Sequence, residues 1–175
     1  MTEKRLTHLY WGYGKGKTTA VMGLALRALG TGWKVLIVQF LKESASGEVR
    51  MLEDLGVPVL RCTHSDRFVF QMDEEEKIRT RASHEQALKQ AIDMVHKEKV
   101  DMLILDEAGS ACETEMLDRE MLKAFVNQKP EHLELVMTAH KLEDWMYEAA
   151  DYVTHMEMQK HPYNQGILAR DGVDF

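Results

Sequence analysis

The segment GYGKGKTT at residues 12–19 combines glycines, lysines and threonines in a pattern that can bind phosphate. Such a loop needs glycines so that successive backbone amides can point inward, and a helix that begins directly after it adds partial positive charge. It also needs a lysine that reaches the phosphates and a hydroxyl that ligates magnesium, and we expect Lys17 and Thr18 to fill these roles. Three glycines can present the amides of the loop: Gly12, Gly14 and Gly16.

The pattern departs from the usual consensus GxxxxGK[ST] at one position, because Trp11 stands where the consensus has its first glycine. The alternative interpretation is a glycine-rich turn between a strand and a helix that binds nothing. The run GKGKTT lies directly after an expected strand and directly before an expected helix, and this context favours the phosphate site.

An acidic pair, Asp106 and Glu107, ends the apolar run VDMLILDE at residues 100–107. A hydrophobic strand that delivers a carboxylate to the edge of a sheet is what a magnesium-bearing nucleotide site requires opposite the lysine. We therefore expect Asp106 and Glu107 to ligate Mg²⁺ directly or through water. The sequence has no NKxD-type guanine-recognition motif, which disfavours a GTPase, whereas a kinase or a simple ATPase stays open from these two motifs.

The elements that must position these residues alternate between strand and helix along the chain. This alternation predicts an α/β fold with a parallel sheet covered by helices on both faces. Right-handed crossovers then place the carboxyl ends of the strands, where ligands bind, along one edge of the sheet. The expected strands are 6–11, 34–40, 57–62, 100–106, 133–138 and 152–158, and the expected helices are 17–29, 47–55, 73–98, 117–127 and 142–150.

The composition limits the classes of protein to which the chain can belong. It has 175 residues, 45% apolar and 29% charged, which is the balance of one globular domain and excludes intrinsic disorder. The net charge of −7 excludes a whole-chain basic nucleic-acid binder. The apolar runs are far shorter than the roughly 18 residues that span a bilayer, no apolar leader begins the chain, and Cys62 and Cys112 lack metal-site spacing. We expect a cytoplasmic protein with no nucleic-acid or membrane partner.

Three separated stretches resemble one known family, the ATP:corrinoid adenosyltransferases of the CobA/BtuR/CobO type. GYGKGKTTA at 12–20 is similar to the family's GNGKGKTTA, in which the first glycine is likewise missing, and VQFLK at 38–42 is similar to VQFIK. The ending EAADYVTHMEMQKHPYNQGILARDGVDF is similar to EAADLVTEM…KH…GIKAQKGIEF, and this ending is specific to the family. The resemblance covers the whole chain, and it implies one P-loop domain over 1–175 with a family-specific tail over 150–175.

The resemblance implies a RecA-like P-loop fold of three layers, a homodimer, and transfer of the 5′-deoxyadenosyl group of ATP to the Co(I) form of a corrinoid, with release of triphosphate. Co(I) is a strong nucleophile, so the protein must align the reactants and stabilise the leaving group. A flavodoxin-like flavoprotein is compatible with this reaction as the reductant. The family's metal is magnesium, or manganese, and Glu107 matches its metal-associated acid. The residues that fall on its ATP loop are Gly12, Gly14, Lys15, Gly16, Lys17, Thr18 and Thr19.

The remaining candidate residues lie where this chain differs from the family. Phe68 and Phe70 in RFVF match GFTW, whose aromatic rings displace the lower axial ligand of cobalt; the alternative is an ordinary loop anchor. The family's TGR is TAH here, so His140 either replaces an arginine near the phosphates as a cation or is a neutral surface residue. We expect His161 to serve packing or substrate contacts. Two other functions stay open: another P-loop kinase or ATPase, and a non-catalytic corrinoid- or nucleotide-binding module.

Overall fold

The computed structural model describes residues 4–42, 46–61 and 67–174. Six parallel strands form one sheet in the order β3-β2-β4-β5-β1-β6, which confirms the α/β expectation. The strands are β1 (Thr7–Trp11), β2 (Val35–Gln39), β3 (Val59–Arg61), β4 (Met102–Asp106), β5 (Glu134–Ala139) and β6 (Tyr152–His155). The helices are α1 (Lys17–Leu29), α2 (Gly47–Asp54), α3 (Glu74–Glu98), α4 (Ala108–Glu113), α5 (Arg119–Asn127) and α6 (Asp144–Ala149), with 3-10 turns η1 (Val69–Gln71) and η2 (Pro162–Gln165).

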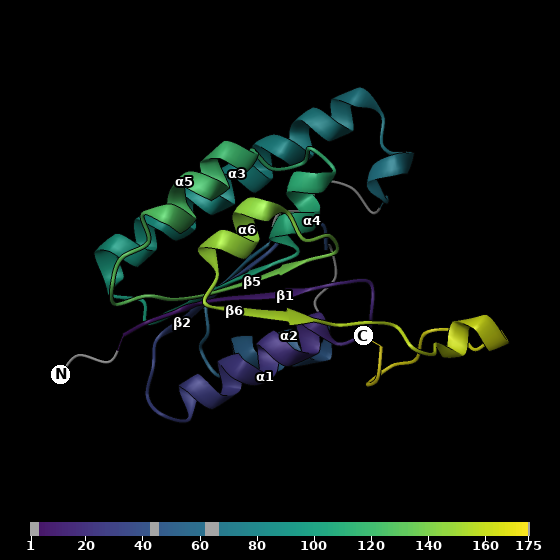
Figure 1. Ribbon diagram of the computed structural model, residues 1–175, viewed down its shortest axis with the longest axis horizontal. Coiled ribbons are helices and arrows are strands. Elements are labelled where there is room, and N and C mark those ends of the chain that lie inside the picture. The colour runs from purple at the N-terminus through teal and green to yellow at the C-terminus, as the bar shows by residue number, and fades with distance from the viewer. Residues whose placement is uncertain (1–3, 43–45, 62–66, 175) are drawn as a thin grey trace.

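Helices cover both faces of the sheet, so that the molecule has three layers (Figure 1). Helices α1 and α2 lie on one face, and α3, α4, α5 and α6 lie on the other. Successive residues of a strand point to opposite faces, so a strand that is covered twice must be apolar throughout. In β4, Leu103 and Leu105 pack toward α3, whereas Met102 and Ile104 pack toward α1.

The long helix α3 begins and ends where its sequence chemistry predicts. The carboxylate of Asp73 accepts a hydrogen bond from the backbone N–H of Glu76, and the Glu76 side chain accepts one from the N–H of Asp73. This reciprocal capping box satisfies two donors that a helix leaves free at its start. The helix ends before Lys99, whose φ of 51° is left-handed.

Two elements differ from the sequence-based expectation. Helix α4 was not expected, because six residues are too short to show a helical period. Strand β6 stops at His155, three residues before the expected end, because the chain there turns toward the phosphate loop: the Gly14 N–H donates to the Met156 carbonyl at 2.8 Å. The expected end of the third strand, Cys62, lies outside the described residues.

The strand order gathers the candidate residues at one edge. Strand β5 lies between β1 and β4, so the loop after β1, Asp106 at the end of β4 and His140 after β5 follow three adjacent strand ends. None of the helices in the described part of the chain is long and apolar enough to cross a membrane.

Candidate active site

The loop between β1 and α1 depends on glycine at three positions. Gly12 has φ 120°, and a Cβ atom at Gly12 or at Gly14 would collide with the carbonyl oxygen of Met156. Gly16 has φ 111° and directly precedes the first residue of α1. Only glycine adopts such a backbone without steric cost. The loop can therefore turn tightly between strand and helix while the chain after β6 packs against it.

Lys17, the first residue of α1, is almost fully buried, with 7% of its surface exposed. Its Nζ donates to the carbonyl oxygens of Gly12 at 2.6 Å and Gly14 at 3.2 Å. Burial lowers the pKa of Lys17 below that of an ordinary lysine, although the nearby carboxylates Glu107 and Asp106 act in the opposite direction. An ammonium group has three donors, so one N–H of Lys17 remains for a further partner.

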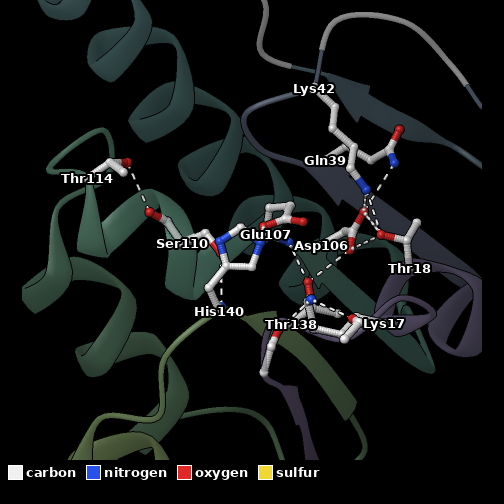
Figure 2. Close-up of polar contacts among 12 residues, drawn as sticks. Lys17, Thr18, Gln39, Lys42, Asp106, Glu107, Ser110, Thr114, Thr138 and His140 are labelled. Carbon is white, nitrogen blue, oxygen red and sulfur yellow. Dashed lines mark hydrogen bonds and ion pairs between the residues drawn. The ribbon is translucent and has the colours of Figure 1, made fainter. Parts of the chain in front are cut away.

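Asp106, at the end of β4, is fully buried and accepts from donors on α1, β2, β5 and the segment after β2 (Figure 2). The hydroxyl of Thr18 lies 3.1 Å from each of its oxygens, and the hydroxyl of Thr138 donates to Oδ1 at 2.9 Å. The amide of Gln39 donates to Oδ2 at 3.3 Å, and Nζ of Lys42 donates to the same oxygen at 2.7 Å. A buried carboxylate is tolerated only when it is hydrogen-bonded and its charge is paired, as here.

Glu107 follows Asp106 in the left-handed region, with φ 62°, and precedes α4. Its backbone N–H donates to the hydroxyl of Thr138 at 2.7 Å, which fixes the turn. Its side-chain Oε2 is buried and has no hydrogen-bond partner among the described residues. The Nε2 atom of His140 lies 3.7 Å from that oxygen, and the His140 ring stacks on Tyr13 with 5.5 Å between ring centroids.

These residues suit a divalent cation of the magnesium type. Mg²⁺ and Mn²⁺ prefer oxygen ligands, and Thr18, Asp106 and Glu107 supply a hydroxyl and two carboxylates at one sheet edge. The unpartnered Oε2 of Glu107 is an observation of the kind that a cation ligand explains. The residues therefore fit the expected metal.

A cavity of about 590 Å³ lies against the phosphate loop. Lys42, Glu107 and residues 13–19 of the loop form one side of this cavity. The C-terminal tail forms another side, through Met158, His161, Tyr163, Asn164 and Asp174. The tail also holds Lys15, whose Nζ donates to the carbonyl of Val173 at 2.6 Å. The cavity is large enough for a nucleotide, since small-ligand pockets commonly span roughly 300–1,000 Å³.

Comparison with known proteins now decides the family. Residues 3–175 match the model of the family described as ATP:corrinoid adenosyltransferase BtuR/CobO/CobP. The chain belongs to this family. A corrinoid adenosyltransferase of a Sinorhizobium species is 32% identical and covers 99% of this chain and 81% of its own. The enzymes of that name from Pseudomonas aeruginosa and Escherichia coli K12 are 32% and 30% identical, each over 99% of this chain and 85% and 87% of their own. The chain is thus a member of a transferase family.

Solved structures share the α/β fold of this chain. Two EssC structures align over 99% of this chain: ATPases 2 and 3 from Geobacillus thermodenitrificans, with a TM-score of 0.50 and 15% identity, and the cytoplasmic domain of EssC, with 0.53 and 17%. The chain spans 37% and 35% of these two chains. At this identity the likeness shows the fold alone.

The aromatic pair that the resemblance assigns to the corrinoid lies apart from the cavity wall. Phe68 and Phe70, in and next to η1, are 71% and 82% exposed and stack on each other with centroids 5.5 Å apart. Neither is among the described residues that line the cavity, and His140 is not either. The exposed rings are compatible with both interpretations, contact with the corrinoid and an ordinary loop anchor, so the role of this pair stays a prediction.

Sequence reasoning did not name Gln39 or Thr138, which hydrogen-bond to Asp106, and it did not assign a role to Lys42. Lys42 is the most informative of the three. The motif VQFLK contained it, and a lysine directly after the strand beside β4 was the available signal. Its ammonium lies 2.6 Å from the Thr18 hydroxyl as well as 2.7 Å from Asp106. The lysine therefore contacts two of the three expected metal ligands, Thr18 and Asp106.

Proposed function

We propose that this chain transfers the 5′-deoxyadenosyl group of ATP to the Co(I) centre of a corrinoid. The observation that supports this is a nucleotide-sized cavity lined by a phosphate loop, Lys42 and Glu107, in a member of the corrinoid adenosyltransferase family. The buried Asp106 is hydrogen-bonded to two residues of that lining, Thr18 and Lys42. In the reaction the electron pair of Co(I) forms a bond to C5′ of ATP. The C5′–O bond breaks, its electron pair stays on oxygen, and triphosphate leaves.

The residues of the protein bind the polyphosphate, balance its charge and align C5′ with cobalt. The amides of the loop and the N-terminus of α1 bind the polyphosphate, and Lys17 supplies a positive charge that is already buried before the substrate arrives. Co(I) carries its own electron pair, so no side chain has to remove a proton. The cavity wall formed by the tail then keeps C5′ in line with cobalt, and such alignment removes much of the entropic barrier.

Thr18, Asp106 and Glu107 are the residues that would hold Mg²⁺ or Mn²⁺ in this proposal. When bound, the cation would neutralise charge that develops on the leaving triphosphate. Thr138 positions both acids, because its hydroxyl donates to Asp106 and accepts from the backbone of Glu107. We further propose a homodimer in the cytoplasm that receives electrons from a flavodoxin-like flavoprotein.

An anaerobic assay with ATP and chemically reduced cobalamin tests the proposed function. We expect loss of the Co(I) spectrum, formation of adenosylcobalamin and stoichiometric inorganic triphosphate. Release of ADP or of phosphate plus ADP would instead identify a kinase or an ATPase. Binding of ATP or cobalamin without turnover would identify a non-catalytic module.

Phe68 and Phe70 provide a second, more specific test of this function. Their exposed rings can replace a polar axial ligand of Co(II) by apolar surface, which makes the electron easier to accept. We expect Phe70→Ala to lose activity selectively, at least tenfold, when Co(II)-cobalamin and an external reductant are supplied. With Co(I) supplied directly the same variant should stay within threefold of the unmodified chain. Equal losses in both assays would show that the ring only supports the fold or the corrin.

A further inference from the structure

Lys42 lies between Thr18, which follows the phosphate loop, and Asp106 at the end of β4, and residues of these two kinds hold Mg²⁺ in P-loop nucleotide sites. Its Nζ donates to Thr18 Oγ1 at 2.6 Å and to Asp106 Oδ2 at 2.7 Å, and the side chain borders the cavity (Figure 2). A hydroxyl and a carboxylate of this kind are also oxygen ligands for Mg²⁺. The ammonium and a metal ion would therefore use the same lone pairs.

The backbone that carries Lys42 is fixed, so its approach to Asp106 is part of the fold. The N–H of Phe40 donates to the carbonyl of Asp106 at 3.0 Å, continuing the pairing of β2 with β4. Leu41 has φ 55°, and its N–H donates to Nε2 of the buried His84 at 3.3 Å. These contacts hold the end of β2 beside the end of β4 and leave the Lys42 side chain free to change partners.

The local charge also favours an exchange of cations. The formal charges of Lys17 and Lys42 are positive and those of Asp106 and Glu107 are negative, so these four side chains sum to zero. A divalent cation that entered without other change would raise the charge of the cluster to +2 and would meet two ammonium groups nearby. A polyphosphate supplies the missing negative charge and gives a displaced ammonium a new partner.

We propose that Lys42 and the divalent cation compete for Thr18 and Asp106, and that a metal–polyphosphate complex moves Lys42 from these oxygens onto the phosphates. The inference rests on the proposed function, because it takes a metal–triphosphate unit as the ligand. Lys42 thus keeps the metal site closed to the metal alone and joins the phosphate site when the complex binds.

Two binding measurements in the absence of corrinoid test this exchange, with Mn²⁺ as the probe. The first is binding of Mn²⁺ alone, followed by electron paramagnetic resonance, and the second is binding of the manganese–triphosphate complex, followed by calorimetry. We expect Lys42→Met to bind Mn²⁺ alone at least tenfold more tightly and the complex at least tenfold more weakly than the unmodified chain. Lys42→Gln keeps an N–H donor for Asp106. Like Lys42→Met, it should bind Mn²⁺ alone more tightly and the manganese–triphosphate complex more weakly than the unmodified chain does.

Lys97→Met is the matched control, because Lys97 also pairs with a carboxylate, Asp93, at 2.6 Å but lies on the exposed end of α3. It should leave both affinities unchanged. Weaker binding of both probes to the Lys42 variants would show a purely structural role, and unchanged Mn²⁺ binding would show that no competition occurs; either result overturns the inference. Failure of the unmodified chain to bind manganese–triphosphate would overturn the proposed function together with this inference.

Discussion

The site contains charged side chains that are buried. Lys17, which lines the cavity, and Asp106 are both buried, and the charged form of either group is costly there unless it is hydrogen-bonded. The loop carbonyls satisfy Lys17 and four donors satisfy Asp106, whereas the Oε2 atom of Glu107 has no hydrogen-bond partner in the described part of the chain. A ligand could therefore bind at Glu107 Oε2 and at the remaining N–H of Lys17.

Lys17→Met should change both the affinity for triphosphate and the pH dependence of the free energy of unfolding. Charge-assisted contacts are worth about 1.5–3 kcal/mol, so triphosphate affinity should fall about 10–150-fold. Burial lowers the pKa of Lys17, so the unfolded chain binds this proton more tightly than the folded chain does. The free energy of unfolding must then rise with pH between the lowered pKa and the ordinary value of about 10.4. Urea unfolding at a series of alkaline pH values should show a smaller rise in the variant, and equal slopes would contradict the assignment.

Tyr13 and His140 are two positions at which this chain differs from the family residues, asparagine and arginine, and they touch each other. Their rings stack with an interplanar angle of 18°. Aromatic pairs of this kind are worth about 0.5–1.5 kcal/mol beyond the area they bury. The two residues that differ from the family therefore interact with each other, and we expect their effects on the site to be coupled.

A double-mutant cycle with Tyr13→Asn and His140→Arg tests this coupling. Each single variant should lower kcat/KM for ATP, and the double variant should recover about 2–10-fold relative to the product of the two losses. Tyr13→Phe keeps the ring and should keep the coupling to His140. Strict additivity of the two losses in kcat/KM would mean that the stack has no part in the site.

Helices and strands with a clear hydrophobic pattern could be predicted from the sequence, whereas an element that forms through tertiary contacts could not. Residues Lys17–Leu29 form α1 as the apolar period indicates, and the buried run of β4 follows from its unbroken hydrophobicity. Helix α4 has no such pattern. It forms because Glu107 turns left-handed against Thr138 and because two small residues, Ala108 and Gly109, pack on the sheet. Such a helix is specified by tertiary contacts, which spacing along the chain does not show.

Gly109 sets how closely α4 approaches β5. A Cβ atom at this position would collide with the Cβ of Ala139, and α4 directly follows Glu107, which we propose as a metal ligand. Gly109→Ala should lower the free energy of unfolding by about 1–3 kcal/mol, the usual cost of overpacking. Ala139→Gly in the same chain should restore part of that loss. Gly23→Ala in α1 meets no atom within 4 Å and should instead stabilise the chain by up to about 1 kcal/mol, which makes it the matched control in urea titrations.

At the scale of the whole molecule, the site depends on residues that the chain brings together from distant positions. The meeting of the loop after β1 with the acids after β4 follows from the rule for parallel strands and could be predicted. The contact of Lys42 with Asp106 could not, because it needs the left-handed turn at Leu41. The tail is a similar case: its match to the family was visible in the sequence, but its place over the loop follows from close packing of Met156 on Gly14.

Removal of residues 160–175 should therefore abolish alignment while sparing the fold. All the buried apolar residues of the described core precede Met158, and the described tail residues beyond it are mostly exposed. In Figure 1 the end of the chain, in yellow, extends away from the layered body. The melting temperature should change by no more than about 2 °C, because little apolar area is lost. Inorganic triphosphate should bind within threefold of its normal affinity, since its contacts lie in the loop. Adenosyl transfer from ATP to supplied Co(I)-cobalamin should fall at least tenfold, because the wall formed by His161, Tyr163 and Asn164 is gone.

A melting temperature lowered by 10 °C or more would make the tail part of the fold, and unchanged transfer would remove it from the site.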